Sequence, residues 1–166
     1  MNIKDKKFFH KLKLSSNNNI AIIGSSFCSC LVGDHIKSEF GSKVVFYEKT
    51  NFIGGAWRFD KLGNIFSNIL APTSIEERKI FDKIVKFLNK KNIKMKKTNF
   101  HSFYSNQIVD SYFFDFDNFY KKIKREHLFR KLKVRSISEN NSHILINNKF
   151  KHDYVFFPNY VDINKI

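Results

Sequence analysis

The sequence predicts an α/β fold, in which flanking helices cover a parallel sheet and a small β-meander follows. The first observation is an apolar run of strand length at residues 20–23, which stops abruptly at Gly24 as a buried parallel strand does. The second is a helical pattern with another apolar run directly behind it, and the third is a series of short strands near the C-terminus. With 166 residues, 42% of them apolar, the chain is long enough for about one domain with a real core.

Residues 20–47 predict a strand, a glycine turn, a helix and a second strand. Between the two apolar runs, residues 27–40 place apolar side chains at roughly helical spacing, although Gly33 weakens the pattern, and Gly41 can cap the helix. A βαβ unit of this length crosses over right-handed and pairs its strands in parallel. We therefore expect a basic polar leader at residues 1–19 and one domain over residues 20–166.

The middle of the chain predicts a loop, a helix and one or two strands. Residues 51–72 have no clear period and form a loop long enough to suggest a function. A capping box at residues 74–77 begins an amphipathic helix that reaches about residue 90. The aromatic stretch at residues 100–116 predicts one or two strands.

The last third of the chain predicts a second amphipathic helix and then strands. Asp117 is expected to cap this helix, which would turn Leu128 and Leu132 toward the core. A turn at residues 139–142 separates the first two of three expected strands, at residues 134–138, 143–146 and 154–157.

The chain is strongly basic, with 30 Lys and Arg against 15 Asp and Glu and a net charge of +15. Such a surface binds phosphate backbones nonspecifically through counterion release. Only five of the basic residues are Arg, whereas base contacts and bidentate phosphate clamps favour Arg. We therefore attribute the charge to a lysine-rich composition and do not expect nucleic acid to be the main partner.

We expect a cytoplasmic protein without a membrane span. No apolar run approaches the ~20 residues that cross a bilayer, and lysines interrupt the apolar pairs of the leader, unlike the core of a signal peptide. Cys28 and Cys30 lie two positions apart, where neither a helix nor a strand allows a relaxed disulfide, and this favours reduced thiols.

No metal site is predicted, because a lone Cys-x-Cys is a weak signal and the histidines show no ligand spacing. We expect the histidines to be partly exposed side chains: His10, His35, His101, His127, His143 and His152.

The glycine turn at residue 24 is a candidate phosphate site. A strand that leads directly into a helix leaves backbone N–H groups and a positive dipole end facing outward. The dinucleotide fingerprint G-x-G-x-x-G has glycine at all three positions, but here Gly24 is followed by Ser26 and Ser29. Glu48 lies 24 residues after Gly24, where a carboxylate would bind the ribose hydroxyls of a nucleotide.

The loop after this strand carries a second motif, in which Glu48 and Lys49 are followed by the segment Phe-Ile-Gly-Gly-Ala-Trp-Arg at residues 52–58. This motif resembles flavoproteins with two dinucleotide-binding domains, such as amine oxidases, flavin monooxygenases and pyranose mutases. The resemblance covers residues 20–72, and residues 151–158 resemble the family's strand after a three-stranded meander. It implies a Rossmann-like FAD/NAD(P)-binding fold that is incomplete at the C-terminus.

The resemblance also implies roles for individual residues around FAD. The pyrophosphate would lie on Gly24, Ser25 and Ser26, and the ribose on Glu48. The rest of the implied cofactor site consists of Lys49, Gly54, Gly55, Trp57 and Arg58. Paired glycines let backbone approach a ligand closely. Trp57 could equally pack in a core, and Arg58 could be a solvated charge.

Two departures from the family pattern qualify this interpretation. The Cβ of Ser26 should push the cofactor away or open the turn, so affinity should suffer. Family members usually need more than twice this length, which implies an N-terminal portion of a truncated or split flavoprotein, with catalytic residues unknown and a second chain as a possible partner.

Three functions therefore stay open. The first is an FAD-dependent oxidoreductase whose ADP-binding part is this chain, not catalytically complete alone. The second is a degenerate Rossmann-like module that no longer binds nucleotide and acts in protein interactions. The third, and least favoured, is a small basic nucleic-acid-binding protein.

Overall fold

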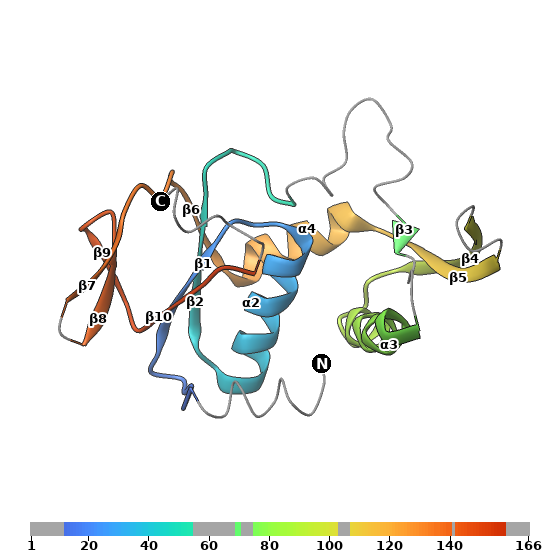
Figure 1. Cartoon of the computed structure of the whole chain (residues 1–166), viewed down its shortest axis with the longest axis horizontal. Helices are drawn as coiled ribbons and strands as arrows, with labels where there is room; N and C mark the ends of the chain where they lie inside the picture. The colour runs from blue at the N-terminus through green and yellow to red at the C-terminus, as the bar shows by residue number, and fades with distance from the viewer. Residues whose placement is uncertain (1–11, 55–68, 71–74, 103–106, 141, 159–166) are drawn as a thin grey trace. The chain divides into compact units, whose positions relative to one another are not determined.

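The computed structural model describes residues 12–54, 69–70, 75–102, 107–140 and 142–158 (Figure 1). The chain divides into two compact units. Unit 1 comprises residues 1–12 and 59–119, and unit 2 comprises residues 13–58 and 120–166. Within the described ranges, no helix has both the length and the apolar character that a membrane crossing requires.

Unit 2 is built on a four-stranded parallel sheet. The predicted βαβ unit is confirmed: β1 (Asn19–Ile23) leads through α2 (Phe27–Phe40) to β2 (Lys43–Glu48), and the two strands pair in parallel. Strands β6 (Leu128–Lys131) and β10 (Tyr154–Phe156) complete the sheet in the order β10-β1-β2-β6. A parallel sheet with flanking helices and small antiparallel sheets is thus the observed α/β architecture.

One face of this sheet packs closely against α2. The closeness depends on Gly33, because a Cβ there would lie 2.3 Å from Cζ of Phe46 and 2.8 Å from Cδ1 of Ile22. The glycine that weakens the helical pattern is therefore the residue that lets the helix approach the sheet. At the end of α2, Gly41 adopts φ +70° and donates its N–H to the carbonyl of Lys37, which confirms it as the helix cap.

The other face of the sheet packs against an antiparallel meander. This meander consists of β7 (Ile137–Asn140), β8 (His143–Ile146) and β9 (Phe150–His152). Side chains that alternate with those facing α2 form its core: Ala21, Val45 and Tyr47 with Ile146. The expected small β-meander is thus present, but the strand pattern of the sequence did not include β9 and placed the start of β7 at residue 134.

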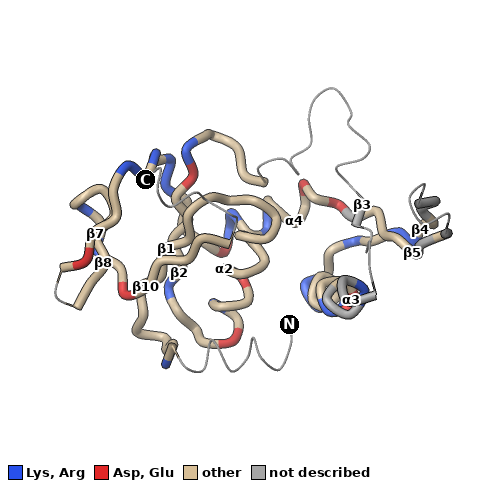
Figure 2. The backbone as a smooth tube through the Cα atoms, viewed as in Figure 1, with Lys and Arg blue, Asp and Glu red and all other residues tan. Residues whose placement is uncertain are grey.

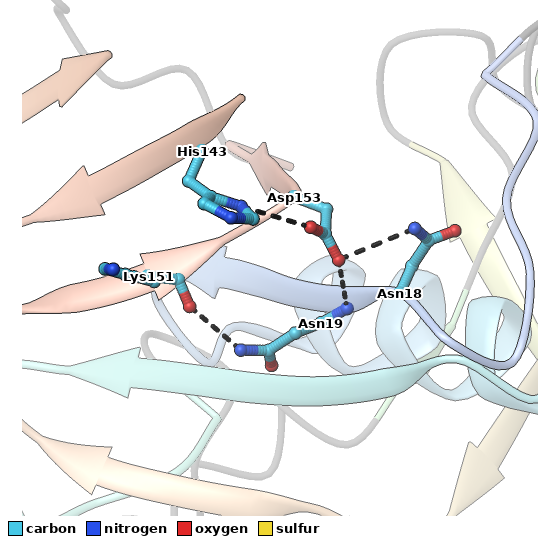
Figure 3. Close-up of polar contacts among 5 residues, drawn as sticks. All are labelled: Asn18, Asn19, His143, Lys151 and Asp153. Carbon is cyan, nitrogen blue, oxygen red and sulfur yellow. Dashed lines mark hydrogen bonds and ion pairs between the residues drawn. The ribbon is translucent and has the colours of Figure 1, made fainter. Parts of the chain in front are cut away.

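A carboxylate fastens the meander to the beginning of β1 (Figure 3). Oδ2 of Asp153 accepts the backbone N–H of Asn19 at 2.7 Å and lies 3.5 Å from Nδ2 of Asn18. Its Oδ1 lies 3.5 Å from Nδ1 of His143, and Asn19 donates from Nδ2 to the carbonyl of Lys151. These contacts fix the point at which the chain leaves β9 and joins the parallel sheet as β10.

The predicted helix after residue 117 is wrong in its extent and its cap. Helix α4 (Phe116–Glu126) is capped by Asp115, whose Oδ1 accepts the N–H of Asn118 at 2.9 Å. Leu128 was expected on the face of this helix that turns toward the protein core. It instead begins β6 and is 45% exposed. The ring of Phe129 stacks on Phe46 at 4.6 Å, so pairing with β2 overrides the local helical period.

Unit 1 combines a helix with a three-stranded antiparallel sheet. Helix α3 (Ile75–Lys90) confirms the predicted amphipathic helix, while its expected cap at residue 74 lies outside the described ranges. The sheet has the order β3-β5-β4, where β3 is Ile69–Leu70, β4 is Met95–Ser102 and β5 is Gln107–Phe114. Phe81 on the buried side of α3 contacts the ring of Tyr112, with centroids 5.7 Å apart.

Candidate functional site

The candidate site begins at the turn that leaves β1. Gly24 adopts φ +85°, a conformation that favours glycine, and donates its N–H to the carbonyl of Tyr47 at 2.8 Å. This turn places Ser25 and Ser26 at the amino end of α2. The position that the sequence predicts for a pyrophosphate therefore exists as a strand, a turn and a helix N-terminus.

Ser26 caps α2 with its own side chain. It has extended backbone angles, φ −62° and ψ 170°, and its Oγ accepts the N–H of Ser29 at 3.3 Å. The two hydroxyl oxygens are also 3.1 Å apart, and Ser29 is fully buried. Serines at the second and third fingerprint positions thus form a capping pair that uses one of the helix donors.

Glu48 lies beside the turn, and both of its carboxylate oxygens accept hydrogen bonds from the chain itself. Oε2 accepts from the N–H of Ser25 at 3.0 Å and from its Oγ at 2.7 Å. Oε1 accepts from the N–H of Thr50 at 3.0 Å and from its Oγ1 at 3.1 Å. A carboxylate can accept about four hydrogen bonds, so these four contacts occupy all of its acceptor positions. The sequence predicted the place of Glu48 but not these donors.

Gly54 also reaches the turn. It bridges to Ser26 in parallel fashion and donates its N–H to the carbonyl of Ser25 at 2.7 Å. Its φ is +110°, and a Cβ would lie 2.7 Å from the ring of Tyr120. Glycine is therefore needed here for the backbone angle and for space against Tyr120, a contact that the sequence did not predict.

The other residues of the predicted cofactor site are less informative. Lys49 is exposed after β2. Gly55, Trp57 and Arg58 lie outside the described residues.

The strand order places the turn at a position where α/β proteins often bind ligands. From β1 the chain first builds outward through β2 to β6 and then returns to the other side of β1 as β10. Ligands of open parallel sheets bind beyond the carboxyl ends of the strands at such a reversal. Gly24 follows the carboxyl end of β1 and Glu48 is the last residue of β2, so both lie on this edge of the sheet.

Two histidines are buried, contrary to the expectation of partly exposed side chains. His127 is 8% exposed and His152 is 3% exposed. Nε2 of His152 forms a hydrogen bond of 2.7 Å with the hydroxyl of Tyr47, and burial together with the nearby Arg130 lowers the pKa of His152 to about 4. Alternation along β9 places Phe150 and His152 on one face, which is the signal that the sequence offered.

The cysteines are both free thiols, as the sequence predicted. Cys30 is buried and donates from Sγ to the carbonyl of Ser25 at 3.5 Å, while Cys28 is exposed. Burial raises the pKa of both thiols, and the nearby Asp34 adds to this effect at Cys30. Neither thiol has the lowered pKa of an activated nucleophile.

Comparison of the chain with protein-family models and with curated proteins finds no match in either set. Any functional assignment therefore depends on the residues and the geometry described above.

Proposed function

We propose that unit 2 is the dinucleotide-binding domain of an FAD-dependent oxidoreductase, with a Rossmann-like fold that binds the ADP half of the cofactor. The observation that carries the proposal is the contact between Glu48 and Ser25. It brings the carboxylate predicted to bind ribose within hydrogen-bond distance of the turn predicted to bind pyrophosphate. The reversal of strand order beside this turn supports the same location.

The residues of the turn fit an adenosine diphosphate in part. Gly24 presents backbone without a Cβ directly before Ser25, and the amino end of α2 favours negative charge. Glu48 can accept ribose hydroxyls only if they replace the donors of Ser25 or Thr50, since both of its oxygens are engaged. We therefore propose weak binding. The flavin would supply hydride transfer, while this chain positions the nucleotide and a second chain completes the site.

A second candidate function is a degenerate module that no longer binds nucleotide and acts in protein interactions. The specific observation in its favour is that the polar groups of the candidate site form hydrogen bonds with other residues of the same chain. Glu48 accepts four hydrogen bonds from Ser25 and Thr50, and Ser26 uses its hydroxyl as a helix cap.

Nucleic-acid binding has less support. Lys and Arg are spread over elements of both units (Figure 2), and a lysine-rich surface of this kind gives mainly nonspecific, salt-dependent attraction.

The proposal is tested by titrating the purified full-length protein with ADP and with FAD, using calorimetry and thermal melting. Glu48→Gln should weaken ADP binding about tenfold, because it removes the charge from the ribose acceptor. Thr50→Val should have the opposite effect, roughly threefold tighter binding, because it frees one position on Oε1. Glu39→Gln alters an exposed carboxylate near the C-terminal end of α2, away from the turn, and serves as the control.

Two results decide between the candidates. Opposite shifts from Glu48→Gln and Thr50→Val, with no change from Glu39→Gln, would support the nucleotide site. A melting temperature that does not respond to excess FAD, ADP or NAD would instead favour the degenerate module. Oligonucleotide binding that stays tight at high salt would revive the nucleic-acid function.

A further inference from the structure

Three potential metal ligands meet on the helix-covered face of the parallel sheet. Asp34 lies in the middle of α2, Glu126 ends α4, and His127 follows directly before β6. Their ligand atoms all lie within 4.8 Å of one another, and no other group of three such residues occurs in the part of the chain that is described. Asp34 and His127 are buried, at 1% and 8% exposure, while Glu126 is half-buried.

The distance between the two buried groups suits a shared ion. Nε2 of His127 lies 3.5 Å from Oδ1 of Asp34. This separation is longer than the roughly 2.7–2.9 Å of a charge-assisted hydrogen bond. Two ligands of one tetrahedral zinc ion, each at about 2.0–2.2 Å from the metal, are about 3.4 Å apart. The pair is therefore spaced as metal ligands are, and a carboxylate oxygen of the half-buried Glu126 lies within 4.8 Å of both ligand atoms.

The two carboxylates of the cluster also favour the binding of a cation. The carboxylates of Asp34 and Glu126 lie within 4.8 Å of each other, so a cation between them would offset their like-charge repulsion. Lys37 contributes one positive charge at the rim, where its Nζ donates to the backbone carbonyl of Glu126.

The imidazole of His127 faces Asp34 through its Nε2 atom. Its Nδ1 is buried and has no hydrogen-bond partner among the described residues. The contact with Asp34 at Nε2 is long, and the ring otherwise packs edge-on against Phe46, with centroids 5.4 Å apart. An ion bound at Nε2 would replace this long contact, while Nδ1, on the other side of the ring, would keep its proton.

We propose that Asp34, Glu126 and His127 bind a divalent transition-metal ion of the zinc class. The ion fastens the middle of α2 to the junction between α4 and β6, with water in the fourth position. An imidazole beside two carboxylates suits Zn²⁺ or Co²⁺ better than Mg²⁺ or Ca²⁺, which prefer oxygen ligands alone. The proposal does not depend on the nucleotide site, because it involves none of the residues of the Gly24 turn.

The test is a titration of the full-length protein with CoCl₂ after dialysis against a chelator. Co²⁺ in a site with nitrogen and oxygen ligands gives visible absorption bands, so binding and stoichiometry are read directly. We expect saturable binding of one ion per chain, displacement by Zn²⁺, a higher melting temperature with the metal, and no response to Mg²⁺.

Variants locate the ion. Glu126→Gln changes a half-buried side chain, so the fold should persist, and Co²⁺ affinity should fall about tenfold or more. Asp34→Asn keeps the shape of the buried side chain and should have at least the same effect. His143→Gln is the matched control, because His143 and Asp153 are also 3.5 Å apart but lie at 45% and 29% exposure, outside the three-ligand group.

The outcomes are distinct even if Asp34→Asn fails to fold. Absence of one-to-one Co²⁺ binding by the wild-type chain would overturn the proposal and leave a metal-free contact between Asp34 and His127. Binding that is unchanged in Glu126→Gln, or lost in His143→Gln, would place the ion elsewhere and overturn it equally.

Discussion

The two faces of the parallel sheet in unit 2 each bury a histidine against the same strand. Phe46 and Tyr47 are neighbours in β2, so their side chains point to opposite faces. Phe46 meets the ring of His127 edge-on at 5.4 Å, and Tyr47 meets the ring of His152 edge-on at 5.5 Å. The ring contacts match, but the polar partners of the two imidazoles differ.

This difference gives the two faces different chemistry. On the meander face, the partner of His152 is the neutral hydroxyl of Tyr47, and the positive neighbour Arg130 lies over the ring of Phe150. On the helix face, the partner of His127 is the buried carboxylate of Asp34. The same residue type is therefore kept neutral on one face, while on the other it faces negative charge and forms part of a candidate cation site.

Acid should destabilise the packing between the parallel sheet and the meander, and this loss of unfolding free energy is the largest effect that we expect. Burial and Arg130 lower the pKa of His152 to about 4, from an ordinary value of 6.5. The folded state thus favours the neutral imidazole, and its stabilising contribution is complete above pH 6.5 and is lost as the pH falls toward 4. Lowering the pH from 7 to 4 should cost roughly 3 kcal/mol of unfolding free energy through this residue, as measured by urea denaturation.

Carboxylates also titrate in this range, so the contribution of His152 is isolated by a variant. His152→Gln keeps an acceptor for the hydroxyl of Tyr47 but has no charge to gain in acid. The variant should therefore lose less stability than the wild type between pH 7 and pH 4. The same acid dependence in both proteins would remove His152 as the cause, and His143→Gln controls for the loss of an exposed histidine.

One added methyl group at Gly33 should destabilise the packing of α2 on the parallel sheet. Gly33→Ala would place a Cβ 2.3 Å from Cζ of the fully buried Phe46. We expect a loss of about 2 kcal/mol in unfolding free energy from overpacking, even though Ala favours a helix by about 1 kcal/mol over Gly. Denaturant unfolding monitored by circular dichroism measures this loss.

A second substitution sharpens the Gly33 prediction. Phe46→Leu removes the ring atoms that would overlap, so the double variant should be more stable than the sum of the two single changes implies. Strict additivity would show that Gly33 and Phe46 are not coupled, and the close approach of α2 would need another explanation.

The parts of unit 2 that the sequence predicts well are those set by neighbouring residues. The turn at Gly24 and the cap at Gly41 follow from local backbone demands, so the βαβ unit is predictable. The place of Glu48 at the end of β2 is predictable for the same reason. Its hydrogen bonds to Ser25 and Thr50 are not, because they depend on how the turn and the strand end meet in space.

The parts that the sequence misses depend on residues far apart along the chain. Asp34 and His127 are separated by 93 positions, and no spacing rule connects them. Leu128 continues a helical period, yet parallel pairing with β2 makes it the start of a strand. The requirement for glycine at position 33 also cannot be predicted from the sequence, because only the position of the Phe46 ring shows that a side chain would not fit there.

The smallest effect that we predict comes from one hydroxyl on the meander face. Tyr47→Phe keeps the ring in place and removes the 2.7 Å hydrogen bond to Nε2 of His152. Burial raises the pKa of Tyr47, so the wild-type phenol stays protonated and can donate to the neutral imidazole. Because Nε2 would lose this partner inside the protein, unfolding free energy should fall by about 1 kcal/mol at pH 7. The loss should be smaller in the His152→Gln background if the two groups act as a pair, and equal losses in both backgrounds would show that they do not.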